Sequence, residues 1–296
     1  MTDPLRPRRS VLYMPGSNTR ALAKARDLPC DAIIMDLEDV VAPAAKNIAR
    51  DNVVAAIQAG GYGDREIVVR INGIYTEWGE DDLAAATVCG ADAILCPKIN
   101  AAAQINKVAD MMTINGAPET QRIWVMAETP RAIIDIDAIA GAEPRLAVIV
   151  MGTSDLLKAL RLPTDPERTG LLPSLGQCIL AARSAGLDIL DGVHVDLADP
   201  AGFQQVCDQG KALGFDGKTL IHPGQIETAN TVFGVSPEDA ARAAAICAAW
   251  EAAAANGQGI AVLNDRMIEE LHATESHRLL ALDAAIRNRA AGTETE

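Results

Sequence analysis

The chain has 296 residues, of which 49% are hydrophobic and 22% charged, and its 26 Lys and Arg against 40 Asp and Glu give a net charge of −14 at pH 7. This apolar fraction excludes a disordered chain, because it is large enough to build a core. The acidic balance argues against a general nucleic-acid binder, since neutralising phosphates requires a basic face. An anionic ligand could still bind in a local basic pocket.

The sequence shows no feature that indicates secretion, membrane insertion or a zinc site. Residues 1–10 are polar and contain Arg6, Arg8 and Arg9, with no apolar stretch behind them. No apolar run approaches the roughly 20 residues that cross a bilayer. The six cysteines form no C-x-x-C pair, and most lie in apolar stretches, which is typical of reduced, buried thiols. We therefore expect a cytoplasmic protein without zinc that binds neither nucleic acid nor a membrane.

Short apolar runs rich in Val and Ile alternate with Ala-rich amphipathic segments through the first three quarters of the chain. The expected strands are Ser10–Met14, Ala32–Asp36, Ile67–Ile71, Ala93–Cys96, Ile123–Ala127, Leu146–Met151, Leu187–Leu190 and Gly217–Ile221. The expected helices between them include Thr19–Arg26, Lys46–Gln58, Ala101–Met112 and Ser174–Ala185. Continuous apolar runs are typical of strands that are buried on both faces of a parallel sheet.

Eight strand–helix units in about 230 residues predict a (β/α)₈ TIM barrel. We place this barrel, as the catalytic domain, at residues 1–235. A doubly wound sheet is the alternative, but it usually carries a G-x-G-x-x-G loop after its first strand. Residues 14–18 read Met-Pro-Gly-Ser-Asn instead, so the barrel is favoured.

The pattern changes in the last quarter of the chain, which we expect to form a C-terminal helical extension, residues 236–296, packing on a neighbouring subunit. Residues 236–239 read Ser-Pro-Glu-Asp, which favours a helix start, and Gly257 suits the end of that helix. A short apolar piece, Ile260–Leu263, then precedes a second expected helix, Met267–Asn288.

Polar and charged residues follow most of the expected strands, and in a TIM barrel these positions share the rim where active sites form. They are Asp36, Glu38, Asp39, Arg70, Asn72, Pro97, Lys98, Glu128, Thr129, Gly152–Asp155, Asp191, His194 and His222. Clustered carboxylates repel one another unless cations neutralise them. A hard divalent cation such as Mg²⁺ takes such oxygen ligands, and Glu128 and Asp155 follow neighbouring strands. The alternative is that each carboxylate pairs with an arginine or caps a helix.

Taken together, these blocks resemble the citrate lyase beta-chain/malyl-CoA lyase family of Mg²⁺-dependent acyl-CoA enzymes. The matching blocks are residues 9–17, 36–43 with Lys46 and Arg50 behind them, 69–73, 97–98, 128–129, 152–156, 217–223 and 257–271. They follow in the family's order, and the resemblance extends from about Arg9 to Leu282. Each block alone is a weak signal, whereas the whole set is specific.

The resemblance implies a TIM barrel in which Glu128 and Asp155 hold Mg²⁺, and the metal binds a 2-oxo acid such as glyoxylate. It also implies that Arg70 contacts substrate oxygens, together with Glu128, and stabilises the enolate that forms at the thioester. A fixed guanidinium beside developing negative charge contributes strongly to such reactions.

Asp36, Glu38 and Asp39 are interpreted as supporting residues that hold Arg70, Lys98 or metal-bound waters. A structural ion pair between Arg70 and Asp36 or Glu38 is the alternative, and it is compatible with a role in the site.

Further residues match family positions that contact CoA or transfer a proton. Tyr13 and Lys24 match positions associated with CoA, although Asn18 stands where some relatives carry a basic residue. Glu269 matches an acid that transfers a proton in a neighbouring subunit's site, and Asp265 is a weaker candidate because relatives usually carry Gly there. A general acid or base of this kind must reach the reacting group.

The expected activity is reversible, Mg²⁺-dependent cleavage of a 3-hydroxyacyl-CoA, such as malyl-CoA or citramalyl-CoA, into an acyl-CoA and a 2-oxo acid. The alternatives within the family are a (S)-malyl-CoA thioesterase and a citrate lyase beta chain acting on a carrier-protein thioester. A phosphoenolpyruvate-type barrel or a catalytically silent scaffold would lack part of the residue set above. The expected partners are an acyl-CoA ester and a 2-oxo acid, and the expected assembly is a homotrimer or hexamer.

Overall fold

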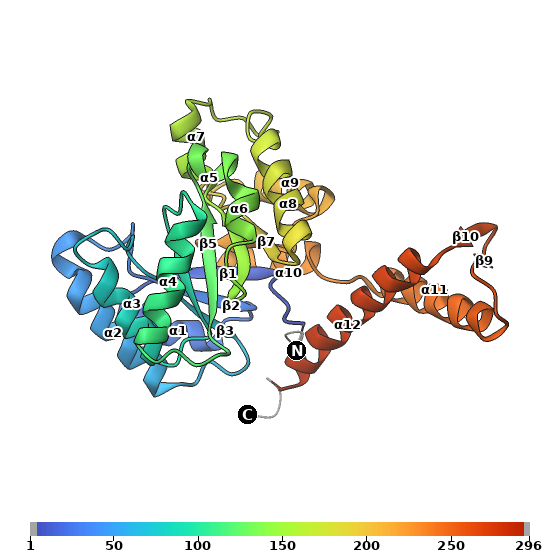
Figure 1. The fold of residues 1–296 in the computed structure, drawn as a ribbon, viewed down its shortest axis with the longest axis horizontal. Coiled ribbons are helices and arrows are strands. Elements are labelled where there is room, and N and C mark those ends of the chain that lie inside the picture. Colours follow the sequence, from blue (N-terminus) through green and yellow to red (C-terminus); the bar gives the residue numbers. More distant parts are fainter. Residues whose placement is uncertain (1–4, 293–296) are drawn as a thin grey trace. The chain divides into compact units, whose positions relative to one another are not determined.

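The structure is a computed structural model that describes residues 5–292. Eight parallel strands close into one barrel in chain order, and β8 pairs back to β1. Figure 1 shows labelled strands of this barrel, such as β1, β2 and β3. The strands are β1 (Ser10–Pro15), β2 (Ala32–Asp36), β3 (Glu66–Arg70), β4 (Ala93–Cys96), β5 (Arg122–Ala127), β6 (Leu146–Met151), β7 (Asp188–Asp191) and β8 (Gly217–Leu220). The predicted TIM barrel is therefore confirmed.

Helices follow the strands of the barrel. They are α1 (Thr19–Lys24), α2 (Lys46–Ala59), α3 (Gly79–Val88), α4 (Ala102–Ile114), α5 (Pro130–Ile134), α6 (Ile136–Ala140), α7 (Thr153–Leu160), α8 (Leu172–Ala185), α9 (Pro200–Leu213) and α10 (Ile226–Val232). Among the described residues, no helix combines the length and apolar character needed to cross a membrane. All six cysteines are buried and unbridged.

The strands separate two apolar layers, which explains why they read as continuous apolar runs. One layer fills the barrel with side chains such as Ile34, Val68, Trp124 and Val150. The other lies between the strands and the surrounding helices and includes their neighbours in sequence, such as Ile33. Because successive strand residues point to opposite faces, each strand must be apolar on both.

Arg8 closes the N-terminal end of the barrel. Its Nε and Nη2 donate to the carboxylate of Glu66 on β3 at 2.7 and 2.8 Å, and its Nη1 donates to Asp188 on β7 at 2.5 Å. The guanidinium also lies 5.3 Å from the ring centre of Trp124. Since β3 and β7 lie four strands apart in a closed eight-stranded barrel, this one side chain connects opposite walls.

Residues 8–233 form one compact unit, and the remaining described residues, 5–7 and 234–292, belong to the other. In the second unit, helix α11 (Pro237–Ala255) packs on helix α12 (Glu270–Gly292), and the hairpin β9 (Ala261–Leu263) and β10 (Arg266–Ile268) joins them.

The expectation that a helix begins at Met267 is wrong, because Met267 pairs with Val262 across the hairpin. Asn264 and Asp265 form the two-residue turn with positive φ angles of 51° and 59°, the conformation that Asn and Asp favour in tight hairpins.

Candidate functional site

Arg70, the last residue of β3, lies at the centre of a charged cluster at the C-terminal end of the barrel. Its Nε and Nη2 donate to the two carboxylate oxygens of Asp36 at 2.7 and 2.6 Å. Asp36 ends β2 directly opposite Arg70 in the strand register. The Arg70 Nη1 lies 2.9 Å from Glu38 and 3.9 Å from Asp39, and the guanidinium stacks 4.8 Å from the ring centre of Tyr13. The paired carboxylate fixes the guanidinium plane.

Burial changes the acid–base properties of this cluster. It raises the pKa of Glu38 to about 7, although the nearby Arg70 opposes the increase. Burial also raises the pKa of the Tyr13 phenol. The Glu38 Oε2 faces Arg70 outside hydrogen-bonding geometry and has no other partner. Glu38 is therefore a buried carboxyl group with a raised pKa beside a permanent positive charge.

Glu128 and Asp155, the expected metal ligands, converge on Lys98. Glu128 directly follows β5, and Asp155 lies in the first turn of α7 after β6. The Lys98 backbone N–H donates to Glu128 Oε1 at 2.6 Å, and its Nζ donates to Asp155 Oδ2 at 2.9 Å. The same Nζ lies 3.5 Å from Glu128 Oε1. Lys98 has a φ of 53°, which is uncommon for a residue with a side chain. This backbone conformation accompanies the contacts of both its amide and its ammonium group.

The Glu128 side chain fits a hard cation. It is 1% exposed, and its Oε2 has no hydrogen-bond partner. Burial raises the pKa of Glu128, while Lys98 opposes that increase. An unpartnered buried carboxylate oxygen is costly, and Mg²⁺ is bound by such oxygens. The described residues contain no group of three or more His, Cys, Asp or Glu side chains able to enclose a metal. A cation at Glu128 and Asp155 would therefore take its remaining ligands from water or substrate, as Mg²⁺ commonly does.

Gly152 makes room for Glu128. A Cβ at this position would lie 2.3 Å from the Glu128 Cβ and 2.8 Å from its Oε2. Only glycine leaves the space in which the carboxylate now lies.

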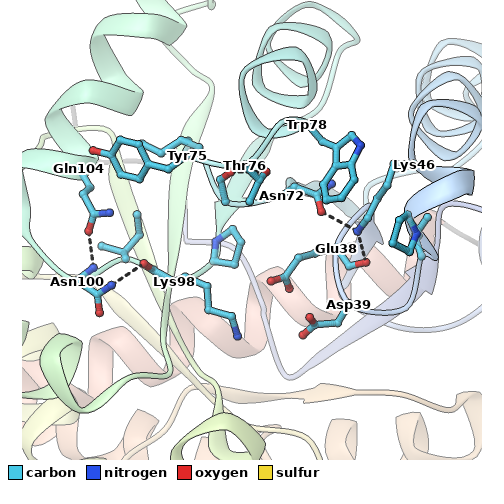
Figure 2. Close-up of a pocket in the computed structure, with 16 residues that line it drawn as sticks. Glu38, Asp39, Lys46, Asn72, Tyr75, Thr76, Trp78, Lys98, Asn100 and Gln104 are labelled. Atoms are coloured by element: carbon cyan, nitrogen blue, oxygen red, sulfur yellow. Dashed lines mark hydrogen bonds between the residues drawn. The ribbon is translucent and has the colours of Figure 1, made fainter. Parts of the chain in front are cut away.

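A cavity of about 630 Å³ opens at the ends of β2, β3 and β4. Figure 2 shows the carboxylates of Glu38 and Asp39 facing the ammonium of Lys98 across this cavity. The cavity thus joins the Arg70 cluster to the Glu128 cluster, since Lys98 belongs to the second and Glu38 to the first. A substrate held here would meet the Lys98 ammonium on one side and the carboxylates of Glu38 and Asp39 on the other.

Lys46 and Trp78 line the same cavity, and the sequence pattern gave neither of them a specific role there. The buried Lys46 ammonium donates to the carbonyl oxygens of Leu37 and Glu38 and to Asn72 Oδ1, at 2.7 to 2.8 Å. It also lies 5.3 Å from the Trp78 ring centre. Lys46 therefore holds the loop that carries Glu38. The spacing of Lys46 behind the acidic block was its only signal in the sequence.

The structure brings Tyr13, Asp36, Glu38 and Asp39 to Arg70. Lys24 ends α1 with an exposed side chain. Glu269 belongs to the C-terminal unit and is half-buried immediately before α12, where its backbone N–H donates to His272 Nδ1 at 3.0 Å.

The chain is similar to known proteins of one enzyme family. The family model described as HpcH/HpaI aldolase/citrate lyase matches residues 9–223. A (3S)-malyl-CoA thioesterase from Cereibacter sphaeroides is 45% identical over 97% of this chain and 98% of its own. The citrate lyase subunit beta of Escherichia coli is 36% identical over 89% of each chain. The crystal structure of protein CitE from Mycobacterium tuberculosis in complex with magnesium, acetoacetate and coenzyme A is 26% identical. It superposes with a TM-score of 0.72 over 93% of this chain and 97% of its own.

Proposed function

Because the chain belongs to the HpcH/HpaI aldolase/citrate lyase family, as its motifs predicted, we propose that it is a Mg²⁺-dependent enzyme acting on the CoA thioester of a hydroxy acid. The observation that carries the proposal is the buried, unpartnered Oε2 of Glu128, which lies in a cluster with Asp155 and Lys98. The magnesium bound to the similar CitE protein supports the choice of cation.

The proposed reaction is hydrolysis of (3S)-malyl-CoA to malate and CoA. Identity of 45% to a thioesterase with that substrate, over nearly the full length of both chains, favours this reaction over our first expectation of carbon–carbon cleavage. Cleavage of a 3-hydroxyacyl-CoA into an acyl-CoA and a 2-oxo acid is the second candidate. The similarity to a citrate lyase subunit and to a structure with bound acetoacetate supports that candidate.

Each residue of the site has a chemical part in this proposal. Mg²⁺ held by Glu128 and Asp155 would polarise and orient the substrate's oxygens. Arg70, fixed by Asp36, presents a guanidinium that does not need to reorient when negative charge develops on the thioester oxygen. Glu38, with its pKa near 7, is placed to exchange a proton in the cavity that Lys98 also lines.

Tyr13 and Lys24 are proposed to contact CoA, on the basis of their positions in the matching motifs. Glu269 is proposed to transfer a proton in the site of a neighbouring subunit, which requires an oligomer such as a trimer or hexamer. Support for the role of Glu269 comes from the resemblance of the C-terminal block, residues 257–271, to the family motif.

Product analysis tests the reaction. The protein is incubated with (S)-malyl-CoA and Mg²⁺, and malate, free CoA, glyoxylate and acetyl-CoA are quantified. Malate with CoA and no glyoxylate is the expected result, whereas glyoxylate with acetyl-CoA would replace hydrolysis by the second candidate. Glu128→Gln and Asp155→Asn should each abolish Mg²⁺ binding by calorimetry and leave the fold intact, with the exposed Glu119→Gln as control. Undiminished Mg²⁺ binding in both variants would remove the metal assignment.

Subunit mixing tests the part assigned to Glu269. Inactive Glu269→Gln and inactive Glu128→Gln subunits are unfolded together and refolded as an equimolar mixture. If each site uses Glu128 from one subunit and Glu269 from the next, random assembly restores about a quarter of the wild-type activity. A mixture that stays inactive would overturn the exchange between subunits.

A further inference from the structure

A second cavity, of about 370 Å³, lies between the α7–α8 loop, the β7–α9 loop and α9. It shares no lining residue with the cavity of Figure 2. Much of its wall is apolar and includes Leu157, Leu162, Leu171, Val195 and Val206. A cavity of this size with a mostly apolar wall and a few polar groups is typical of a small-molecule site.

Two polar groups in this wall have buried nitrogen atoms without partners. Arg168 is only 9% exposed; its Nη1 donates to both carboxylate oxygens of Asp191 at 2.7 and 2.8 Å, and its Nε donates to Gln209 at 2.7 Å. Its Nη2 has no partner, and neither does Nε2 of His194. Six side-chain nitrogen or oxygen atoms in the described part of the chain share this condition, so the occurrence of two in one cavity marks it as unusual.

The cluster behind Arg168 carries excess positive charge. Asp191 is fully buried and pairs with both Arg168 and the fully buried Lys218, whose Nζ lies 2.9 Å away. One carboxylate thus serves two cations. An uncompensated charge taken out of water is costly unless another group of opposite sign complements it.

The acidic residues that also line the cavity form no ion pair with Arg168 within the described part of the chain, where its carboxylate partner is Asp191. Asp165 accepts the backbone N–H groups of Glu167 and Thr169 in the α7–α8 loop. Asp196 and Asp199 likewise accept backbone N–H groups two and three residues further along the chain. These carboxylates shape the two loops.

We propose that this cavity binds a small organic monocarboxylate with a short apolar chain. The carboxylate accepts hydrogen bonds from Arg168 Nη2 and from His194 Nε2, which donates when it carries the ring proton. The chain of the ligand packs on the leucine and valine side chains of the wall. Thr153 and Ser154, which precede Asp155 in α7, also line the cavity, so the ligand contacts the helix that carries a proposed metal ligand. The site is independent of the reaction proposed above.

Binding of isovalerate to the full-length protein at neutral pH, measured by calorimetry, tests this proposal. The neutral isostere isovaleramide and inorganic phosphate serve as probes of the two parts of the ligand. We expect saturable binding of one isovalerate per chain, with isovaleramide at least tenfold weaker. Absence of saturable isovalerate binding, equal affinity for the amide, or binding of phosphate alone would each overturn the proposal.

Variants locate the site without disturbing the Asp191 cluster. His194→Ala removes one donor, and Leu162→Trp fills the cavity from the α7–α8 loop; each should weaken isovalerate more than tenfold. Leu160→Trp is the matched control, because Leu160 is partly exposed and does not line the cavity. Unfolding midpoints establish that each variant is folded. Wild-type affinity in both folded cavity variants would refute the assigned location.

Discussion

Replacing Gly152 by alanine should displace the Glu128 carboxylate and weaken Mg²⁺ binding. The new Cβ would lie 2.3 Å from the Glu128 Cβ, whereas carbon atoms in contact are usually separated by about 3.5 Å. The two groups must therefore move apart by roughly 1.2 Å in total. The new methyl group would clash with the Glu128 Cβ, which is fixed to the backbone, so rotation of the Glu128 carboxylate cannot relieve the clash.

The displacement has two measurable effects. Forcing extra volume into a packed site typically costs about 1–3 kcal/mol of folding free energy. Mg²⁺ requires near-ideal octahedral geometry, and a misplacement of about 1 Å can reduce the function of a site about 100-fold. We expect Gly152→Ala to weaken Mg²⁺ binding at least tenfold and to lower the free energy of unfolding within the range above.

Gly176→Ala provides the matched control. Gly176 lies inside α8, and a Cβ there would meet no atom within 4 Å. Alanine should therefore increase stability by about 0.5–1 kcal/mol through its helix propensity, with unchanged Mg²⁺ affinity. Calorimetric titration with Mg²⁺ and urea unfolding give both quantities. Wild-type Mg²⁺ affinity in Gly152→Ala would refute the reasoning that connects this glycine to the metal site.

Three further substitutions test the charges of the barrel. Asp191→Asn leaves Lys218 and Arg168 without their shared carboxylate and should cost about 3–5 kcal/mol in urea unfolding at pH 7. Burial alone would raise the pKa of Asp191, but the two cations hold it below its usual value. The wild-type protein therefore loses this stabilisation only as the pH falls below about 3.9, and the stability of the variant should not show that loss. Burial raises the pKa of Glu38 from 4.5 to about 7. The free energy of unfolding of wild type should therefore fall relative to that of Glu38→Gln as the pH rises through that interval, by on the order of 1–3 kcal/mol. The same difference between the two proteins at pH 4.5 and at pH 8 would contradict this prediction. Lys98→Met removes the ammonium between two carboxylates, so the Tm of this variant should drop without Mg²⁺ and rise more than that of wild type when Mg²⁺ is added. An equal rise would count against competition between the Lys98 ammonium and Mg²⁺ for these carboxylates.

The barrel could be predicted because each of its strands is marked by an apolar run within a few consecutive residues. Strands β2 and β4 were expected with the bounds that the structure has, since both faces are buried and the whole apolar run defines the strand. Strand β7 was expected to end at Leu190, yet it continues to the charged Asp191. Its compensating partners, Arg168 and Lys218, lie 23 and 27 residues away in the chain, and no local pattern reveals such a pairing.

The site was predictable where two residues end neighbouring strands. An ion pair of Arg70 with Asp36 or Glu38 was one of the interpretations of the sequence, and Asp36 and Arg70 face each other in the register of β2 and β3. The contacts of Lys98 with Asp155 and Glu128 were not predicted, because Lys98 makes them from a left-handed backbone conformation that a lysine rarely adopts. The hairpin turn at residues 264–265 was missed for a different reason. Its Asn-Asp pair is a turn signal, but the apolar residues after it suggested the start of a helix.

The position of Arg8 has a consequence for how the chain assembles during synthesis. Its partners Glu66 and Asp188 follow it by 58 and 180 residues, so its guanidinium leaves the ribosome long before the second carboxylate exists. Contacts between such distant residues form only after the entropy of the intervening loop has been lost. A nascent chain that ends before Asp188 can make the contact with β3 alone, and its barrel stays open at that end. Arg8 is thus translated before both of its partners and is among the last residues to reach its final environment.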